Sequence, residues 1–191
     1  TTGDYFGGEY AYHYMPRKLD YFDVETFRNN PMEFWAVCTN VGTGKAVYKR
    51  LMEVDDACLE YIRASASMPI AARIVTVEGK KLLDGGIADS IPLRFFQEQG
   101  YNRNLVVLTQ PANYVKKPNK LMPLMRLWLR RHPRIIRALE QRHIMYNNQL
   151  EYVRQEEKKP NTLVIRPKKP LTIGHISHNP DDMQATYDHG R

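Results

Sequence analysis

The sequence lacks the features that place a protein across a membrane or outside the cell. No apolar run approaches the roughly 18 residues that a membrane-spanning helix needs. The start shows no charged segment followed by an apolar one, so no signal peptide is visible. Cysteine is scarce: Cys38 and Cys58 are the only two in 191 residues, and both stand among apolar residues. We expect buried thiols in a reducing compartment, with a disulfide as the alternative, and hence a cytoplasmic protein.

Metal and nucleotide motifs are also missing. No Cys/His cluster has the spacing of a metal site, and the one close histidine pair, His175 and His178, has no third ligand beside it. The stretch GTGK at 42–45 resembles a phosphate loop only superficially. A single residue separates its glycines where four are needed, and alanine follows the lysine instead of Ser or Thr. We therefore expect no metal and no cofactor.

Acidic residues are scarce in one window of the chain. The formal net charge is +7, and residues 116–143 hold nine Lys or Arg against one acid. Such a stripe favours an anionic partner, phospholipid or nucleic acid, and no groove-reading motif supports nucleic acid. Apolar residues at helical spacing interrupt the stripe: Leu121, Leu124, Met125, Trp128 and Leu129. Two interpretations stay open. The apolar face packs on the rest of the protein while the bases are solvated, or it makes peripheral contact with an anionic membrane.

What the sequence does contain is the pattern of an α/β protein. Short β-rich apolar runs predict strands, and apolar residues at three- and four-residue spacing predict helices. We expect strands at 33–41, 46–50, 73–77, 80–84, 104–110 and 161–167. We expect helices at 24–29, 54–66, 92–100, 121–133, 134–159 and 179–191, with residues 1–19 irregular. In the helix at 54–66 the buried face should hold Ala57, Leu59, Ile62 and Ala66.

The order of these elements predicts the fold class and two segments. A strand, a glycine-rich turn, a helix and a second apolar strand in succession indicate a parallel α/β layer. We assign residues 1–111 to an α/β domain portion and residues 112–191 to a mostly helical C-terminal region.

The stretch KKLLDGGIADSIP, residues 80–92, carries the most informative polar residue. Asp84 ends an apolar strand, which is where open α/β sheets place their chemistry. Gly85 and Gly86 would let the backbone take positive φ and would leave space beside the carboxylate. An ordinary Asp-Gly turn is the alternative interpretation.

A wider set of motifs resembles the patatin-like phospholipase family. The set runs from AVCTNVGTGKAVYKR through YIRASASMP and DGGIADSIP to the strand NLVVL, about Glu33 to Leu108. The resemblance implies a three-layer α/β/α sheet and a lipid acyl hydrolase with a serine-aspartate dyad. In such a dyad the aspartate takes the serine proton without a histidine. Asp84 matches the family's aspartate, and the substrate would be a phospholipid or another lipid ester. Ser90 stands where many members carry asparagine.

The same resemblance shows what is absent. The family's nucleophile lies in a Gly-x-Ser-x-Gly turn, and this sequence contains no such motif. Ser65, Ser67 and Ser90 are expected to cap or close turns. We therefore expect these residues to be part of a longer enzyme whose missing N-terminal portion carries the serine, the alternative being a remnant without catalysis. The chain alone is predicted to be inactive. The alternative function is a non-catalytic basic module that docks on anionic lipid or nucleic acid.

Overall fold

The computed structural model describes residues 7–171, 173–174, 177 and 179–190. The described residues form two compact units, which alternate along the chain. The first unit takes in residues up to 91 together with 117–146, and the second takes in 92–116 together with the described residues from 147 onward. Helix α5 (Pro133–Glu156) contributes residues to both units. The division into consecutive segments 1–111 and 112–191 stays a prediction.

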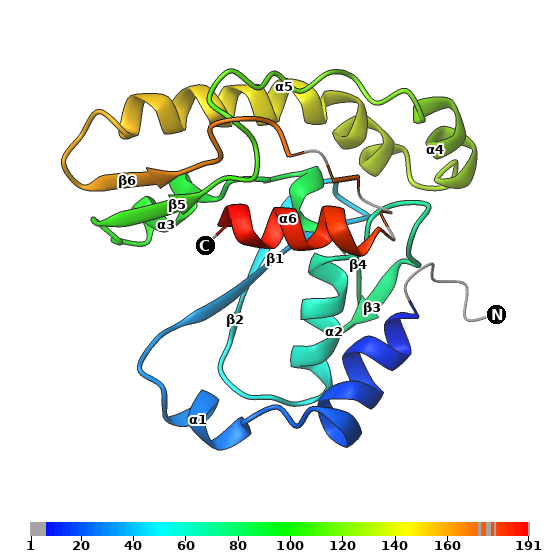
Figure 1. Ribbon diagram of the computed structural model, residues 1–191. Helices are drawn as coiled ribbons and strands as arrows, with labels where there is room; N and C mark the ends of the chain where they lie inside the picture. The colour runs from blue at the N-terminus through cyan, green and yellow to red at the C-terminus, as the bar shows by residue number, and fades with distance from the viewer. Residues whose placement is uncertain (1–6, 172, 175–176, 178, 191) are drawn as a thin grey trace. The chain divides into compact units, whose positions relative to one another are not determined.

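The first unit is built around a four-stranded sheet in the order β2-β1-β4-β3, and all its neighbouring strands are antiparallel (Figure 1). Its strands are β1 (Phe34–Asn40), β2 (Ala46–Leu51), β3 (Val75–Val77) and β4 (Lys80–Asp84). Its helices, besides the start of α5, are η1 (Tyr10–Leu19), α1 (Val24–Asn29), α2 (Asp56–Ser65), η2 (Gly85–Ile87) and α4 (Met122–Trp128). The strands predicted at 73–77 and 80–84 form a hairpin that turns at Glu78 and Gly79, and both residues have positive φ, 48° and 72°.

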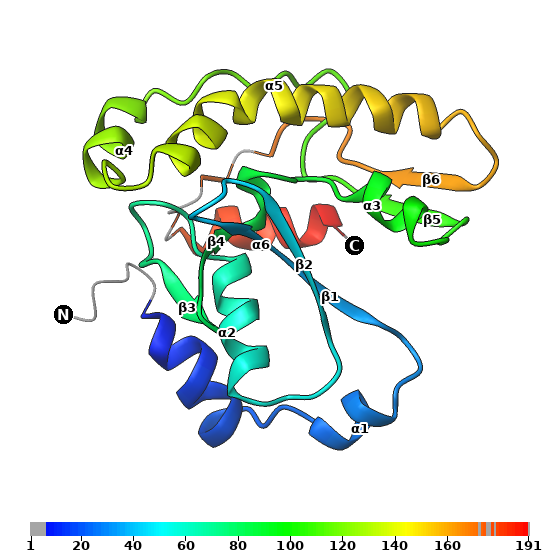
Figure 2. The same ribbon diagram turned by 180° about the vertical axis from the view of Figure 1, so that it is seen from behind.

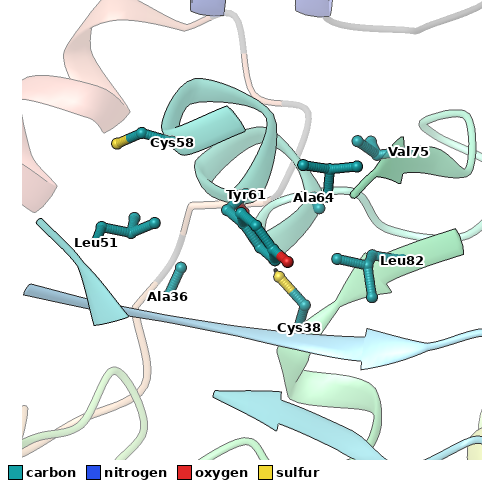
Figure 3. Packing of buried hydrophobic residues seen from close by; sticks show 9 residues of the cluster. Ala36, Cys38, Leu51, Cys58, Tyr61, Ala64, Val75 and Leu82 are labelled. Carbon is teal, nitrogen blue, oxygen red and sulfur yellow. Dashed lines mark hydrogen bonds between the residues drawn. The ribbon is translucent and has the colours of Figure 1, made fainter. Parts of the chain in front are cut away.

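Helices cover both faces of this sheet. Successive residues of a strand point to opposite faces, so Leu82 and Leu83, both completely buried, belong to two separate core clusters. The cluster around Leu82 is built mainly from α2 and the strands, and Figure 3 shows the Tyr61 ring of α2 above Cys38 of β1. The cluster around Leu83 is built from α4 and the first turns of α5. The unit therefore has a helix, sheet, helix arrangement, and the predicted mixed α/β class is confirmed.

The parallel pairing lies elsewhere than expected. The sequence order predicts that the strand after the Asp84 turn, β5 (Asn104–Val107), continues the same layer. Instead β5 pairs with β6 (Thr162–Ile165), in parallel register from Asn104 opposite Thr162 to Val107 opposite Ile165. β4 already has β1 on one side and β3 on the other, so β5 cannot pair with β4 directly.

The second unit contains this parallel pair, α3 (Leu93–Glu98), α6 (Pro180–Gly190) and the end of α5. Its polar interior centres on Glu156, which accepts hydrogen bonds from Gln97 Nε2 at 2.9 Å and from Lys159 Nζ at 2.6 Å. These bonds, first of all the one from Lys159, lower the pKa of Glu156. Tyr152 donates to Gln97 Oε1 at 2.5 Å, so one hydrogen-bond network joins α3 to α5.

Several local predictions are wrong for identifiable reasons. The fully buried residues of α2 are Cys58, Leu59, Tyr61 and Ala64, so the predicted face is right for Leu59, and for Ala57 and Ile62, which pack partly buried against the same cluster, but wrong for the exposed Ala66. Tyr61 can be buried because its hydroxyl donates to Glu78 Oε2 at 2.8 Å, which satisfies its one polar group. Residues 10–19 form the π-helix η1, although the sequence predicts irregular structure there. No helix in the described part of the chain is long and apolar enough to cross a membrane.

Candidate active site

Asp84 lies at the end of β4, as predicted, between β1 and β3. Its backbone N–H donates to the carbonyl oxygen of Ser67 at 2.9 Å. Its own carbonyl oxygen accepts a hydrogen bond at 2.8 Å from Oγ1 of Thr39, a completely buried residue of β1. Thr39 Oγ1 also accepts from the N–H of Ala88 at 3.2 Å, so one hydroxyl holds the strand end and the following turn together.

The carboxylate of Asp84 faces the turn that follows it. Its Oδ1 accepts a hydrogen bond from the backbone N–H of Gly86 at 2.7 Å and so caps the short helix η2. Partial burial raises the pKa of Asp84, while the Gly86 N–H and the nearby Arg142 guanidinium act in the opposite direction. A carboxylate with a raised pKa is a stronger base once ionised. This position is therefore suited to accepting a proton.

Gly85 and Gly86 serve the turn by their lack of a side chain and not by positive φ. Neither glycine has positive φ, which corrects the sequence-based expectation. A Cβ on Gly85 would lie 2.1 Å from the carbonyl oxygen of Val37, so the turn passes directly against β1. A Cβ on Gly86 would lie 3.0 Å from Asp84 Oδ1 and 3.3 Å from Arg142 Nη2. Gly85 therefore allows the close backbone approach, and Gly86 leaves space beside the carboxylate.

Arg142 is a site residue that the sequence reasoning missed. It comes from α5, and its Nε donates to the carbonyl oxygen of Gly86 at 2.7 Å. It follows Leu139 by three residues and Ile135 by seven, and both of these are buried, so Arg142 lies on the inward face of the helix. The signal in the sequence that could have identified Arg142 was a basic residue on an otherwise apolar helix face. Nothing in the sequence identified the turn at Gly86 as its partner.

The serines and Cys38 near this turn have structural roles. Each hydroxyl donates to a backbone carbonyl oxygen: Ser65 to Val37 at 2.8 Å, Ser67 to Arg63 at 2.8 Å and Ser90 to Gly86 at 2.6 Å. Cys38 lies opposite Asp84 in the sheet, and burial, with a smaller effect of the Asp84 charge, raises the pKa of its thiol to about 12. Cys38 therefore stays a thiol at neutral pH and is a poor nucleophile. Both cysteines are unpaired and buried, as expected.

The described residues offer little for other chemistries. They hold no group of three or more His, Cys, Asp or Glu side chains placed to bind a metal. His175 and His178 lie outside the described residues. A hollow of about 530 Å³ lies along η1 and is lined by Glu9, Tyr10, His13, Tyr14, Arg17 and Lys18. None of these residues belongs to the turn after Asp84, so the hollow is separate from the candidate site.

Comparisons with known proteins agree with the recognised motifs. The sequence model of the patatin-like phospholipase family matches residues 9–96, and that of a domain of unknown function, DUF6363, matches residues 132–191. The uncharacterized protein YjjU of Escherichia coli (strain K12) is 26% identical over 174 residues. That alignment covers 80% of this chain and 46% of YjjU, so the chain spans about half the length of that relative. Asp84 lies within the first matched region and Arg142 within the second.

Proposed function

We propose that this chain supplies the general base of a lipid acyl hydrolase, and the match of residues 9–96 to the patatin-like phospholipase model supports this proposal. The base is Asp84, and its partner is a serine outside these 191 residues. The observation that carries the proposal is the position of the Asp84 carboxylate. It is partly buried at a strand end, hydrogen-bonded to the Gly86 N–H, and its pKa is raised by burial.

The proposed reaction is ester hydrolysis in two steps. Asp84 Oδ1 is engaged by Gly86, which leaves the second carboxylate oxygen to accept the serine proton as the serine oxygen attacks the ester carbonyl. The proton then passes to the departing alkoxide as the acyl-enzyme forms. In the second step water attacks the acyl group, Asp84 takes the proton of that water, and the fatty acid leaves as the serine is reprotonated. Gly85, Gly86, Thr39 and Arg142 hold the carboxylate in place and touch no reacting atom in this scheme.

The source of the serine is part of the proposal. The sequence contains no Gly-x-Ser-x-Gly motif. The parallel pair β5–β6 supports completion by further chain: Leu105, Val107, Leu163 and Ile165 are all more than half exposed. Parallel sheets are usually covered on both faces, so an exposed apolar face on one favours additional elements from a longer protein. We infer that the missing N-terminal portion carries the nucleophile and that the chain alone is inactive.

The substrate class follows from the family and from the charge of the chain. We propose a phospholipid or another lipid ester, reached by a cytoplasmic protein through peripheral contact with an anionic membrane. The second candidate is a non-catalytic basic module that docks on anionic lipid or nucleic acid. Exposed basic residues favour this second candidate, because binding through surface charge requires no active site. These residues are Lys117, Lys120, Arg130 and Arg131.

The decisive experiment compares this chain with a longer protein that includes its natural upstream sequence. We expect the longer protein to hydrolyse p-nitrophenyl esters and to react with a fluorophosphonate probe, and this chain to do neither. Asp84→Asn in the longer protein should reduce kcat by at least about 100-fold, the usual contribution of a general base. Asp188→Asn, at an exposed position of α6, is the matched control and should retain activity. Full activity of the Asp84→Asn variant would refute the proposal.

A further inference from the structure

Helix α4 packs against the rest of the first unit with one face only. Met125 and Leu129, 3% and 1% exposed, belong to the core cluster around Leu83. Met122 packs against the same cluster. These residues follow one another at spacings of three and four, so they form one stripe along the helix. The sequence predicted a five-residue apolar face, and the structure buries only two of those five residues.

The face of α4 beside this buried stripe is apolar and exposed. Leu121, Leu124, Leu127 and Trp128 are 54%, 49%, 66% and 43% exposed. Successive members of this set that are three or four residues apart lie next to one another on a helix. Four large apolar side chains therefore gather on one side of this short helix. Figure 2 shows that a turn joins the helix to α5.

The exposed bases around this helix lack acidic partners. Lys120, Arg130 and Arg131 are exposed, and none of them forms an ion pair among the described residues. Arg126 differs, because it pairs with Glu140 at 2.5 Å. The chain contains no Asp or Glu between residues 99 and 139. The positive charge of this region is therefore available to an anionic surface.

We propose that Leu121, Leu124, Leu127 and Trp128, flanked by Lys120, Arg130 and Arg131, form a surface that docks on a bilayer containing anionic phospholipids. We call it the α4 surface. Its leucines would enter the interfacial region, Trp128 would lie at head-group level, and the bases would contact lipid phosphates. Charge complementarity supports this occupant over an uncharged one. The inference rests on the proposed function, in which the substrate is held in a membrane. It identifies the residues that hold the protein at that membrane.

Flotation of the 191-residue chain with vesicles tests the α4 surface. Vesicles of ether-linked phosphatidylcholine with 30% ether-linked phosphatidylglycerol contain no acyl ester, so binding is read independently of hydrolysis. We expect the chain to float with these vesicles and not with pure phosphatidylcholine, and to be released by high salt. No flotation with anionic vesicles would overturn the inference without bearing on the role of Asp84.

Paired variants locate the contact. Arg130→Gln with Arg131→Gln should weaken binding about 25-fold, since each base contributes about fivefold near an anionic surface. Lys168→Gln with Lys169→Gln removes the same charge from exposed positions elsewhere and should change binding less than about twofold. Equal losses in the two double variants would show net charge alone to be responsible and would overturn the assignment of the surface.

The apolar contribution has its own matched pair. Leu124→Ser with Leu127→Ser should weaken binding at least about tenfold, because apolar area no longer leaves water. Leu105→Ser with Leu163→Ser changes two leucines that are 59% and 63% exposed on β5 and β6, and it should have little effect.

In a Trp35→Phe background Trp128 is the sole tryptophan. Its emission should shift to shorter wavelength when anionic vesicles are added. A salt-sensitive gel shift with RNA or DNA, without vesicle binding, would identify nucleic acid as the partner and would overturn the inference.

Discussion

The two glycines after Asp84 should respond very differently to the addition of a methyl group. In Gly85→Ala the new Cβ would lie 2.1 Å from the Val37 carbonyl oxygen and 2.5 Å from its carbon, both backbone atoms of the central strand β1. Relief requires that the turn and β1 separate by more than 1 Å, since ordinary contacts begin near 3.4 Å. In Gly86→Ala the nearest atoms are the ends of the Asp84 and Arg142 side chains, which can move.

The expected loss of unfolding free energy follows from the contacts and hydrogen bonds that this separation would break. Overpacking of a tight site costs about 1–3 kcal/mol. The hydrogen bonds from Ser65 to Val37 and from Thr39 to Asp84 flank the contact, and each contributes about 1 kcal/mol of net stability. We therefore expect Gly85→Ala to lower the free energy of unfolding by about 3–5 kcal/mol. Gly86→Ala should change it by less than about 1 kcal/mol, because Ala also restricts the unfolded chain.

Urea denaturation followed by far-UV circular dichroism measures both variants. Gly79→Ala is the control for backbone strain, because Gly79 has a φ of 72° and no atom within 4 Å of its added Cβ. It should cost about 1–2 kcal/mol from strain alone. A Gly85→Ala protein within 1 kcal/mol of the parent would refute the close approach of the turn to β1, and with it the geometry assigned to Asp84.

Two further predictions concern the ionisation of Asp84. Burial raises the pKa of this carboxyl above its unfolded value, so its contribution to stability is greatest at pH values below the unfolded pKa and is lost as pH rises through the folded pKa. Asp84→Asn should therefore unfold at higher urea concentration than the parent at pH 7, with a smaller difference at low pH. An equal or lower midpoint at pH 7 would contradict this. Arg142→Gln removes a cation that lowers the same pKa, so carboxyl NMR titration should give a higher Asp84 pKa than in the parent. Arg142→Lys keeps the charge and should shift it less. An unchanged titration in Arg142→Gln would show that this cation has no influence on the carboxylate.

The sequence predicted most elements because their signals are local. The helices predicted at 24–29 and 54–66 begin after Asp23 and Asp55, whose side chains accept hydrogen bonds from the N–H three residues later, at 2.9 and 2.7 Å. Asn179, at the start of the helix predicted at 179–191, likewise accepts a hydrogen bond from the N–H of Asp181 at 3.0 Å. The Glu78-Gly79 turn likewise depends on adjacent residues only. These features do not depend on where the rest of the chain lies.

The wrong predictions depend on distant parts of the chain. The pairing of β5 with β6 was missed because the order of elements along the chain does not reveal which strands are neighbours in a sheet. In the structure the two neighbours of β4 are β1 and β3. Tyr61 was missed because its burial requires Glu78 from the β3–β4 turn. Positive φ was expected at Gly85, and the structure does not show it. The restriction comes from Val37 in another strand.

The contact between Arg142 and the turn at Gly86 has a consequence for cutting or recombining this protein. The carboxylate lies in the region matched by the patatin-like phospholipase model, and the cation that tunes it lies in the region of unknown function matched at 132–191. A truncation between those regions would keep every recognised motif and lose the guanidinium. A chimera that exchanged residues 132–191 with those of a relative would keep the effect of Arg142 on the Asp84 pKa only if the relative supplied a cation at the same position.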